Sequence, residues 1–432
     1  MNIIDKLSEK MIPVSQAIGN NKYLLSLRDG FMVAFPATMF ASIMIILQNL
    51  PSTFGFDNAL PTGVMTFIND FIGPVGNATM SISSVFVVFG VGYQLAGHYK
   101  QSQIYSGAIA LSSFLMLVPF GQEETMGTVL PLSSLGAEGM FVGIVAAIIS
   151  TEIYCRISNA GITIKMPESV PPMIASSFIA IIPGSVALLL FNTIRYIFTF
   201  THWGNAIDFV YEILQMPLMG LGDSLPAVLL AVFFTQLLWW FGVHGTLLVN
   251  SIIDPIMSSL AIENYQAYQA GAKELPHIIN TTFMGVFVNQ GMQLGISIAM
   301  AFFIAKSIRM KQTMRTILAP SVFNVSEPMT FGLPIVMNPL ALIPWILAPL
   351  ASTTISYLAI AIGLVPRPIG ATVVWTTPVI LSGLLGTASI RGALLQVVTT
   401  IVMTLIWIPF LVAMDKQYAQ EELTENESLS NI

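Results

Sequence analysis

The chain has 432 residues, of which 55% are hydrophobic and only 9% are charged, and its formal net charge is −6 at neutral pH. Soluble domains contain about 25% charged residues, so this composition excludes an ordinary soluble protein and predicts an integral membrane protein. The acidic balance, without a large basic cluster, argues against a nucleic-acid partner. The single cysteine, Cys155, excludes a disulfide framework and a thiolate metal site, and we expect neither a metal nor another cofactor.

Long apolar segments recur along the whole chain and predict helices that cross a membrane. Each has close to the ~20 residues that a spanning helix needs. Their apolar runs are continuous rather than alternating, which argues against a membrane β-barrel. The candidate spans are residues 31–50, 78–97, 104–120, 133–154, 173–200, 226–249, 281–305, 339–363 and 391–413.

Two further apolar segments, 316–336 and 370–388, are shorter and are interrupted by proline, glycine and small polar residues. Irregular backbone at membrane depth is tolerated only where protein or a water-filled cavity surrounds it, so we expect re-entrant hairpins or broken helices. The segment 202–222 mixes apolar and polar residues and predicts an amphipathic helix at the membrane interface. The predicted fold is an all-α integral membrane protein with about ten transmembrane helices, two re-entrant hairpins and interfacial helices.

The distribution of lysine and arginine predicts which loops face the cytoplasm, where these residues are enriched. Residues 1–30 form an amphipathic segment with four basic residues before the first span, so we expect a cytoplasmic N-terminus. The loops 51–77 and 121–132 lack basic residues and should face outward. The basic cluster 306–315 should be cytoplasmic, as should the acidic tail from Asp415, which we expect to be disordered.

This simple count of crossings fails in the second half of the chain. From an outward-facing segment at 202–222, the spans 226–249 and 281–305 would return the chain to the outer side, whereas the cluster 306–315 belongs in the cytoplasm. A segment within 250–280 must therefore cross or re-enter unconventionally. This favours an irregular transport core behind a regular first half.

Glu327 is a carboxylate inside the apolar tract 323–339. The tract contains several residues that prevent one regular helix, namely Pro328, Gly332, Pro334 and Pro339. A charge near the bilayer centre costs about 2.5–3.5 kcal/mol on insertion scales, so it is usually kept for a function. We interpret Glu327 as part of a substrate site. The structural alternative is a carboxylate that caps the amides of a broken helix or pairs with a basic residue.

Other polar and aromatic residues in apolar surroundings suggest what that substrate is. His244 lies between Gly242 and Gly245, which would let a ligand approach, although a buried histidine bonded to a carbonyl is an alternative. Trp239 and Trp375 offer flat apolar faces, or else serve as interfacial belt residues.

Neutral amides and hydroxyls complete the candidate set. Asn324 and Ser326 flank the carboxylate, and Asn289 and Gln293 open the span 281–305. Such groups suit sugar hydroxyls better than ions, and an aromatic face suits the C–H patch of a sugar ring. Together they predict a saccharide site, while the amides of 289–293 could equally satisfy the backbone of a broken helix.

These motifs together resemble the integral-membrane subunit, enzyme IIC, of the bacterial sugar phosphotransferase system (PTS), in its lactose/cellobiose/diacetylchitobiose family. The resemblance runs along nearly the whole chain, and the tract 323–339 is its most specific part. The other motifs are Pro-Glu-Ser-Val-Pro-Pro (167–172), Ser177-Phe178, Ile182-Pro183, Trp239 to Gly245, Glu263-Asn264, Trp375-Thr-Thr-Pro378 and Ser382-Gly383.

The resemblance implies an elevator-type homodimer in the bacterial inner membrane, with both termini in the cytoplasm. After the cytoplasmic segment 1–30, residues 31–222 would form the scaffold, 223–414 the transport domain with the sugar site, and 415–432 a cytoplasmic tail. The transported sugar would receive a phosphoryl group from a separate IIB chain, which is itself charged by IIA. Membrane lipid would surround the dimer.

The resemblance also assigns roles to particular residues. Glu327 and His244 would contact the region of the sugar's 6-hydroxyl, and Trp239 and Trp375 would pack on the sugar. Two departures leave the sugar's identity open. Ser326 stands where the family usually has asparagine, and residues 289–293 replace a run of small residues.

A different class of protein remains as the alternative. A proton-coupled secondary transporter of a small polar solute would also need an intramembrane acid and broken helices, with Glu327 as the coupling carboxylate. The two differ in their products, since phosphotransfer accumulates sugar phosphate and proton coupling accumulates the free solute.

Overall fold

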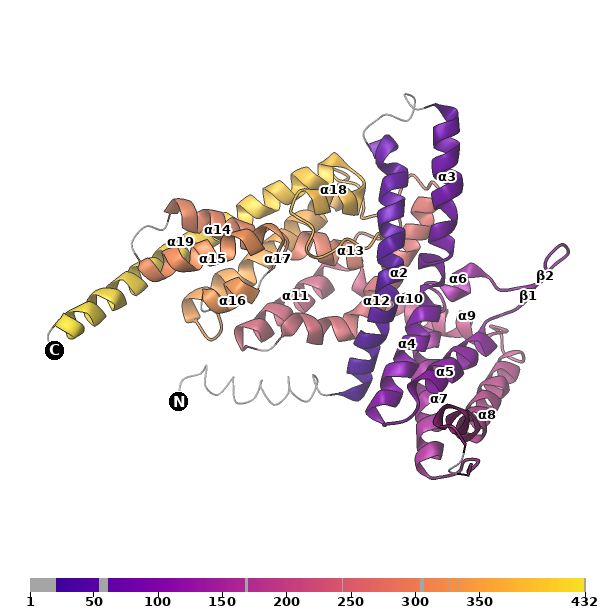
Figure 1. Ribbon diagram of the computed structural model, residues 1–432. Coiled ribbons are helices and arrows are strands. Elements are labelled where there is room, and N and C mark those ends of the chain that lie inside the picture. The colour runs from indigo at the N-terminus through magenta and orange to yellow at the C-terminus, as the bar shows by residue number, and fades with distance from the viewer. Residues whose placement is uncertain are drawn as a thin grey trace.

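A computed structural model describes residues 21–53, 61–167, 170–242, 244–303, 307–325, 327–333 and 335–430, and the predicted N-terminal segment 1–30 therefore lies mostly outside the described residues (Figure 1). The described chain is mostly helical. Its strands form one short antiparallel hairpin of β1 (Gly121–Glu123) and β2 (Gly127–Val129). The helical class predicted from sequence is correct, and this hairpin was not predicted; the positive φ of Gly127 (74°) permits its turn.

The first half of the chain forms one helical bundle, coloured indigo to magenta in Figure 1. Its elements are α2 (Lys22–Thr53), α3 (Thr62–Asn77), η1 (Met80–Ile82), α4 (Ser83–His98), α5 (Gln103–Leu117), α6 (Leu132–Leu135), α7 (Met140–Asn159) and α8 (Pro172–Phe198). Helix α4 lies among α2, α5 and α7. A Cβ atom at Gly90 would lie 2.7 Å from the carbonyl oxygen of Gly30, so the small residues allow α2 and α4 to touch.

Helix α3 corrects one sequence prediction. Residues 51–77 were predicted as an outward-facing loop, yet Thr62–Asn77 is helical and packs along α2. Its exposed face carries Phe67 and Phe71, whose rings stack with centroids 5.5 Å apart. The helix has only 16 residues, and Asn69 and Asp70 interrupt its apolar residues, so its sequence lacks the long apolar run by which spans are found.

A broken linker joins the two halves. Residues 202–222, predicted as an interfacial helix, contain α9 (Ala206–Val210), the π-helical turn η2 (Tyr211–Gln215) and α10 (Met216–Gly222). The linker then bends by 72° into α11 (Leu225–Trp240). The helical prediction is confirmed, and its position at the membrane interface stays a prediction.

The second half extends away from the first bundle, and long helices alternate there with short, interrupted ones (Figure 1). After α11 come α12 (Gly245–Gln269), α13 (Thr281–Phe283), η3 (Met284–Val288), α14 (Met292–Phe303), α15 (Ile308–Val322), α16 (Glu327–Gly332), α17 (Pro339–Ala361), α18 (Leu381–Thr387) and α19 (Ile390–Ser430). Its central core includes Trp345 and Trp407, whose rings meet edge to face.

Several predicted spans are divided in the structure. The predicted span 226–249 breaks between Trp240 and Gly245, and 281–305 breaks at residues 289–291. The segments 316–336 and 370–388 are broken as predicted, although re-entry into a membrane stays a proposal. Within the described ranges, six helical runs are long and apolar enough to cross a membrane, or seven if the bent α10–α11 pair counts as one.

The acidic tail is ordered, contrary to the sequence prediction. Helix α19 continues through Asp415 to Ser430, and its carboxylates bind the beginning of α15. The backbone nitrogen of Ser307 donates to Asp415 (2.9 Å), and the Ser307 hydroxyl donates to Glu422 (2.7 Å). Glu422 also accepts from the backbone nitrogens of Ile308 and Arg309. Negative groups stabilise a helix N-terminus because its first amides lack partners, and this contact orders the tail.

Candidate functional site

The predicted aromatic and histidine residues meet at the turn between α11 and α12. The rings of Trp239 and His244 have centroids 4.2 Å apart, and Trp239 Nε1 donates to Thr246 Oγ1 (3.0 Å). The turn depends on its glycines. Gly242 has φ of 80°, and a Cβ at Gly245 would lie 2.0 Å from the carbonyl oxygen of Thr235. The close approach allows His244 to lie exposed beside the tryptophan.

This turn is joined to the end of the tract 323–339. Trp240 donates from Nε1 to the carbonyl oxygen of Asn338 (2.8 Å) and accepts, at its own carbonyl oxygen, from the nitrogen of Met337 (2.9 Å). The Trp240 side chain is buried, with 2% exposed, so its flat face packs in the core rather than facing a ligand. The structure therefore brings the His244 turn and the Glu327 tract into contact through a residue that sequence reasoning did not select.

Glu327 itself begins α16, a helix of only six residues. The side chain of Glu327 and the whole of Ser326 lie outside the described residues. Their predicted contacts with a substrate consequently stay predictions. The described backbone does establish that the chain is irregular at this point, because α15 ends at Val322 and Asn324 adopts a left-handed conformation (φ 56°).

Asn324 holds this irregular turn through its side chain. Its Oδ1 accepts from the nitrogen of Gly291 (3.2 Å), and its Nδ2 donates to the carbonyl oxygen of Thr377 (2.7 Å) and to Gln290 Oε1 (3.3 Å). The side chain is buried, with 8% exposed. The amide of Asn324 therefore holds the turn against two other segments, and its predicted contact with a substrate stays a prediction.

Of the other predicted residues, Trp375 is exposed, whereas Asn289 lies against a neighbouring helix and Gln293 is buried. Trp375 is 56% exposed, and its carbonyl oxygen accepts from Gln290 Nε2 (3.2 Å). Asn289 Oδ1 accepts from Gln236 Nε2 of α11 (3.0 Å). Gln293 is buried, and no described group donates to its Oε1. Asn324 and Trp375 are thus brought together through Gln290, whereas Gln293 has no described hydrogen bond to them.

Gly291 explains how the break at 289–291 approaches α19. Its φ is 91°, and a Cβ there would lie 2.1 Å from Thr400 Oγ1. Any larger residue would be strained at this φ, and the Thr400 side chain of α19 would have to shift. Sequence reasoning named the amides around this glycine but could not tell which of them reaches the neighbouring breaks, because the π-helical turn η3 disrupts the helical period just before them.

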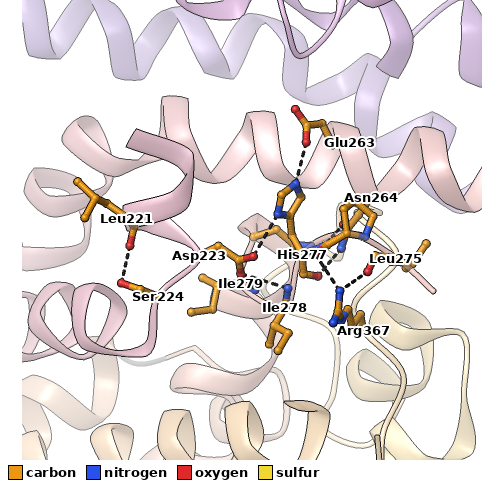
Figure 2. Close-up of polar contacts among 12 residues, drawn as sticks. Leu221, Asp223, Ser224, Glu263, Asn264, Leu275, His277, Ile278, Ile279 and Arg367 are labelled. Atoms are coloured by element: carbon orange, nitrogen blue, oxygen red, sulfur yellow. Dashed lines mark hydrogen bonds and ion pairs between the residues drawn. The ribbon is translucent and has the colours of Figure 1, made fainter. Parts of the chain in front are cut away.

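A second polar cluster, centred on His277, ties the linker to the second half (Figure 2). His277 lies between two carboxylates, with Nδ1 3.1 Å from Asp223 and Nε2 2.7 Å from Glu263. The hydrogen bonds and charges of both carboxylates raise the pKa of His277 to about 9, against the opposing effect of its burial, which is the largest single influence. His277 therefore carries a positive charge at neutral pH and forms two ion pairs.

Hydrogen bonds to backbone extend this cluster across four segments. Asp223 also accepts from the nitrogens of Ile278 (3.1 Å) and Ile279 (2.7 Å). Asn264 of α12 accepts from the nitrogen of His277 (2.8 Å) and donates to the carbonyl oxygen of Pro368 (2.7 Å). The cluster connects the α10–α11 bend, α12, the loop before α13 and the segment before Trp375.

Long apolar helices with polar, hydrogen-bonded breaks define this protein as a membrane transporter. The family model "Phosphotransferase system, EIIC" matches residues 28–349, and the chain belongs to this family of PTS sugar permeases. This confirms the family inferred from the sequence motifs.

Individual relatives are similar over almost their whole length. The chain is 45% identical to an oligo-beta-mannoside-specific EIIC component of Bacillus subtilis, covering 96% of this chain and 94% of that protein. It is 37% identical to a cellobiose-specific EIIC component of Geobacillus stearothermophilus, covering 97% and 96%. The crystal structure of ChbC, the IIC component of an N,N'-diacetylchitobiose-specific phosphotransferase system, matches with a TM-score of 0.90 at 37% identity, covering 96% and 99%.

Proposed function

We propose that this protein transports a β-linked oligosaccharide across the bacterial inner membrane and presents it for phosphorylation by a IIB protein. The observation that carries this proposal is the 45% identity, over nearly the whole chain, to a permease component named for oligo-beta-mannosides. The relatives named for cellobiose and diacetylchitobiose support the same broad substrate class. The comparisons do not favour the proton-coupled alternative.

The site would lie where the broken segments converge. Trp239 and Trp375 present apolar faces to the sugar ring, and His244 hydrogen-bonds near its 6-hydroxyl. Glu327 accepts the proton of that hydroxyl as its oxygen attacks the phosphorus of phospho-IIB. The new O–P bond forms while the S–P bond of the phosphocysteine breaks, and the thiolate leaves on IIB. This subunit contributes position rather than the phosphoryl group.

Transport would use the division of the chain into two packed units. The apolar core of residues mainly from α2, α4, α5 and α7 supports a scaffold over 31–222, and separate cores among α11 to α19 support a transport domain over 223–414. In an elevator motion of a homodimer, the second unit carries the sugar past the first. The exposed Phe67–Phe71 face of α3 is available to a second copy or to lipid.

The experiment that tests this function compares sugars and products. Purified protein is titrated with radiolabelled mannobiose, cellobiose, diacetylchitobiose and lactose, and membranes are then supplied with phosphorylated IIB and IIA. We expect the mannobiose or cellobiose class to bind with the lowest Kd and to yield sugar phosphate. Accumulation of free sugar that depends on a proton gradient and needs no IIB would contradict the proposal.

Trp375→Ala tests the aromatic contact. Loss of an exposed ring that packs on a sugar removes about 1.5 kcal/mol, or roughly a tenfold increase in Kd. The measurement is equilibrium sugar binding to the folded protein. Trp203→Ala in the linker is the matched control and should bind normally, since its ring packs on Phe209 instead. Equal Kd values for Trp375→Ala and wild type would remove Trp375 from the site.

A further inference from the structure

Four buried polar side chains form a network beneath the candidate sugar site. They come from four different segments of the second half, and each is at most 8% exposed. The members are Gln290, Asn324, Ser382 and Gln396. A buried network of this kind is stabilising only when its groups are paired, so its geometry indicates which segments must hold a fixed relation to one another.

Gln396, on α19, makes the largest number of contacts in this network. Its Oε1 accepts from the backbone nitrogens of Ile380 (2.8 Å) and Gly383 (2.6 Å), while its Nε2 donates to the carbonyl oxygen of Val286 (2.8 Å). Only a side chain with both an acceptor and a donor can make these bonds. A glutamate would face the Val286 carbonyl with an oxygen, and a methionine would leave all three backbone groups unpaired.

Ser382 connects Gln396 to Gln290, which lies in the break at 289–291. Its hydroxyl accepts from Gln396 Nε2 (2.8 Å) and donates to Gln290 Oε1 (2.5 Å). Gln290 in turn binds Asn324 through Oε1 and the carbonyl oxygen of Trp375 through Nε2. This chain of hydrogen bonds therefore runs from α19 to the Trp375 loop, which lies between Ala361 and Leu381, and to the turn that precedes Glu327.

The backbone at Ile380 shows why this support is needed. Ile380 has φ of 78° and ψ of −54°, a conformation that β-branched residues rarely adopt and that costs about 1–3 kcal/mol. Such strain persists only where surrounding contacts over-determine it. Gln396 binds the Ile380 nitrogen directly, and a Cβ at Gly383 would lie 2.5 Å from the carbonyl oxygen of Gly392. The turn is held tightly against α19.

We propose that Gln396 is a positioning residue for the sugar site. It fixes the strained turn at Ile380 and, through Ser382 and Gln290, sets the Trp375 loop against the Asn324 turn. It acts through these groups and touches no sugar. This inference rests on the proposed function, since it assigns Gln396 to the site at which that function occurs.

The test replaces Gln396 with methionine, which has nearly the same size but cannot pair with the backbone. We expect the Kd for the transported sugar to rise about tenfold or more in the folded, monodisperse protein. Ser382→Ala, which keeps the bonds of Gln396 to the backbone, should raise Kd by a smaller factor. In the double variant, the change in the free energy of sugar binding should be smaller than the sum of the two single changes, because both substitutions interrupt the same chain of hydrogen bonds. Gln417→Met is the matched control, since Gln417 is exposed on α19 and its amide bonds, within the described ranges, to Glu421 on the same helix. This variant should bind sugar as wild type does.

A second measurement is independent of any sugar. Amide hydrogen exchange should accelerate in Gln396→Met at residues 375–383 and also at 290–291 and 324–325, and it should not change there in Gln417→Met. The inference would be overturned by faster exchange restricted to α19. It would also be overturned if wild type binds sugar and Gln396→Met binds it with the same Kd. Failure of wild type to bind any oligosaccharide would instead overturn the proposed function, while the exchange measurement would still decide whether Gln396 fixes these segments.

Discussion

Replacing Glu327 with glutamine is expected to reduce sugar phosphorylation by at least ~100-fold, the usual contribution of a general base. Glutamine has nearly the same shape and can still hydrogen-bond the hydroxyl, so sugar Kd should change by only a few-fold. It cannot accept the proton that the hydroxyl must lose as it attacks phosphorus. The expected signature is therefore a large fall in kcat with little change in binding.

The measurement uses membranes or purified protein supplied with phosphorylated IIB and radiolabelled sugar, with sugar phosphate as the product. Glu421→Gln, an exposed substitution of the same kind on α19, is the control and should retain full activity. Glu327→Asp should recover part of the rate, because it restores the base at a shorter reach. Wild-type turnover by Glu327→Gln would show that Glu327 is not the proton acceptor.

Replacing His277 with glutamine is expected to destabilise the second half of the protein by about 3 kcal/mol at pH 7. The substitution removes the positive charge that lies between Asp223 and Glu263 and leaves two carboxylates facing each other. Neighbouring groups are already engaged and do not replace the lost positive charge. Tyr211 donates to Glu263, and Arg367 pairs with Glu274 while donating to the backbone carbonyl oxygens of Leu275 and Pro276.

The effect of His277 should depend on pH in a definite direction. Its pKa is raised to about 9 in the folded protein from the ordinary value of 6.5, so protonation stabilises the fold. That contribution is complete below about pH 6.5 and is lost as the pH rises through about 9. Thermal unfolding of wild type and His277→Gln should therefore differ most at pH 6–7 and converge near pH 10. A constant difference across this range would show that the charge is not responsible.

The general architecture and the breaks within 316–336 and 370–388 could be predicted from sequence, whereas the breaks within 226–249 and 281–305 were predicted as continuous spans. Proline and glycine marked the tract 323–339, and composition marked the long apolar spans. Helix α12 was not among the predicted spans, because Asn264 and other polar residues lower its hydropathy, and only the count of crossings pointed to a segment within 250–280. In the fold that amide is satisfied by His277 and Pro368, which lie 13 and 104 residues further along the chain. A hydropathy scale counts the free-energy cost of burying Asn264, but it cannot include the hydrogen bonds that offset this cost, because their partners are distant in sequence.

The site was predictable as a set of segments but not as a set of contacts. Trp239 and His244 were selected together, and their rings do meet. Of the three amides in 289–293, the sequence prediction selected Asn289 and Gln293, yet Gln290 is the one that reaches both Asn324 and the carbonyl oxygen of Trp375, whereas Asn289 binds α11. The difference arises from the direction in which each side chain leaves an irregular turn, and that direction is set by tertiary packing.

The contact between the tail and α15 has a consequence for biosynthesis. Asp415 follows Ser307 by 108 residues, so the beginning of α15 emerges from the ribosome well before the carboxylates that satisfy its amides. During membrane insertion the segment that leads into Glu327 therefore lacks these carboxylate partners until residues 415–422 of α19 have been synthesised. A nascent chain arrested before residue 415 would expose this helix start to protease, and its protection would report that Asp415 and Glu422 have docked on α15.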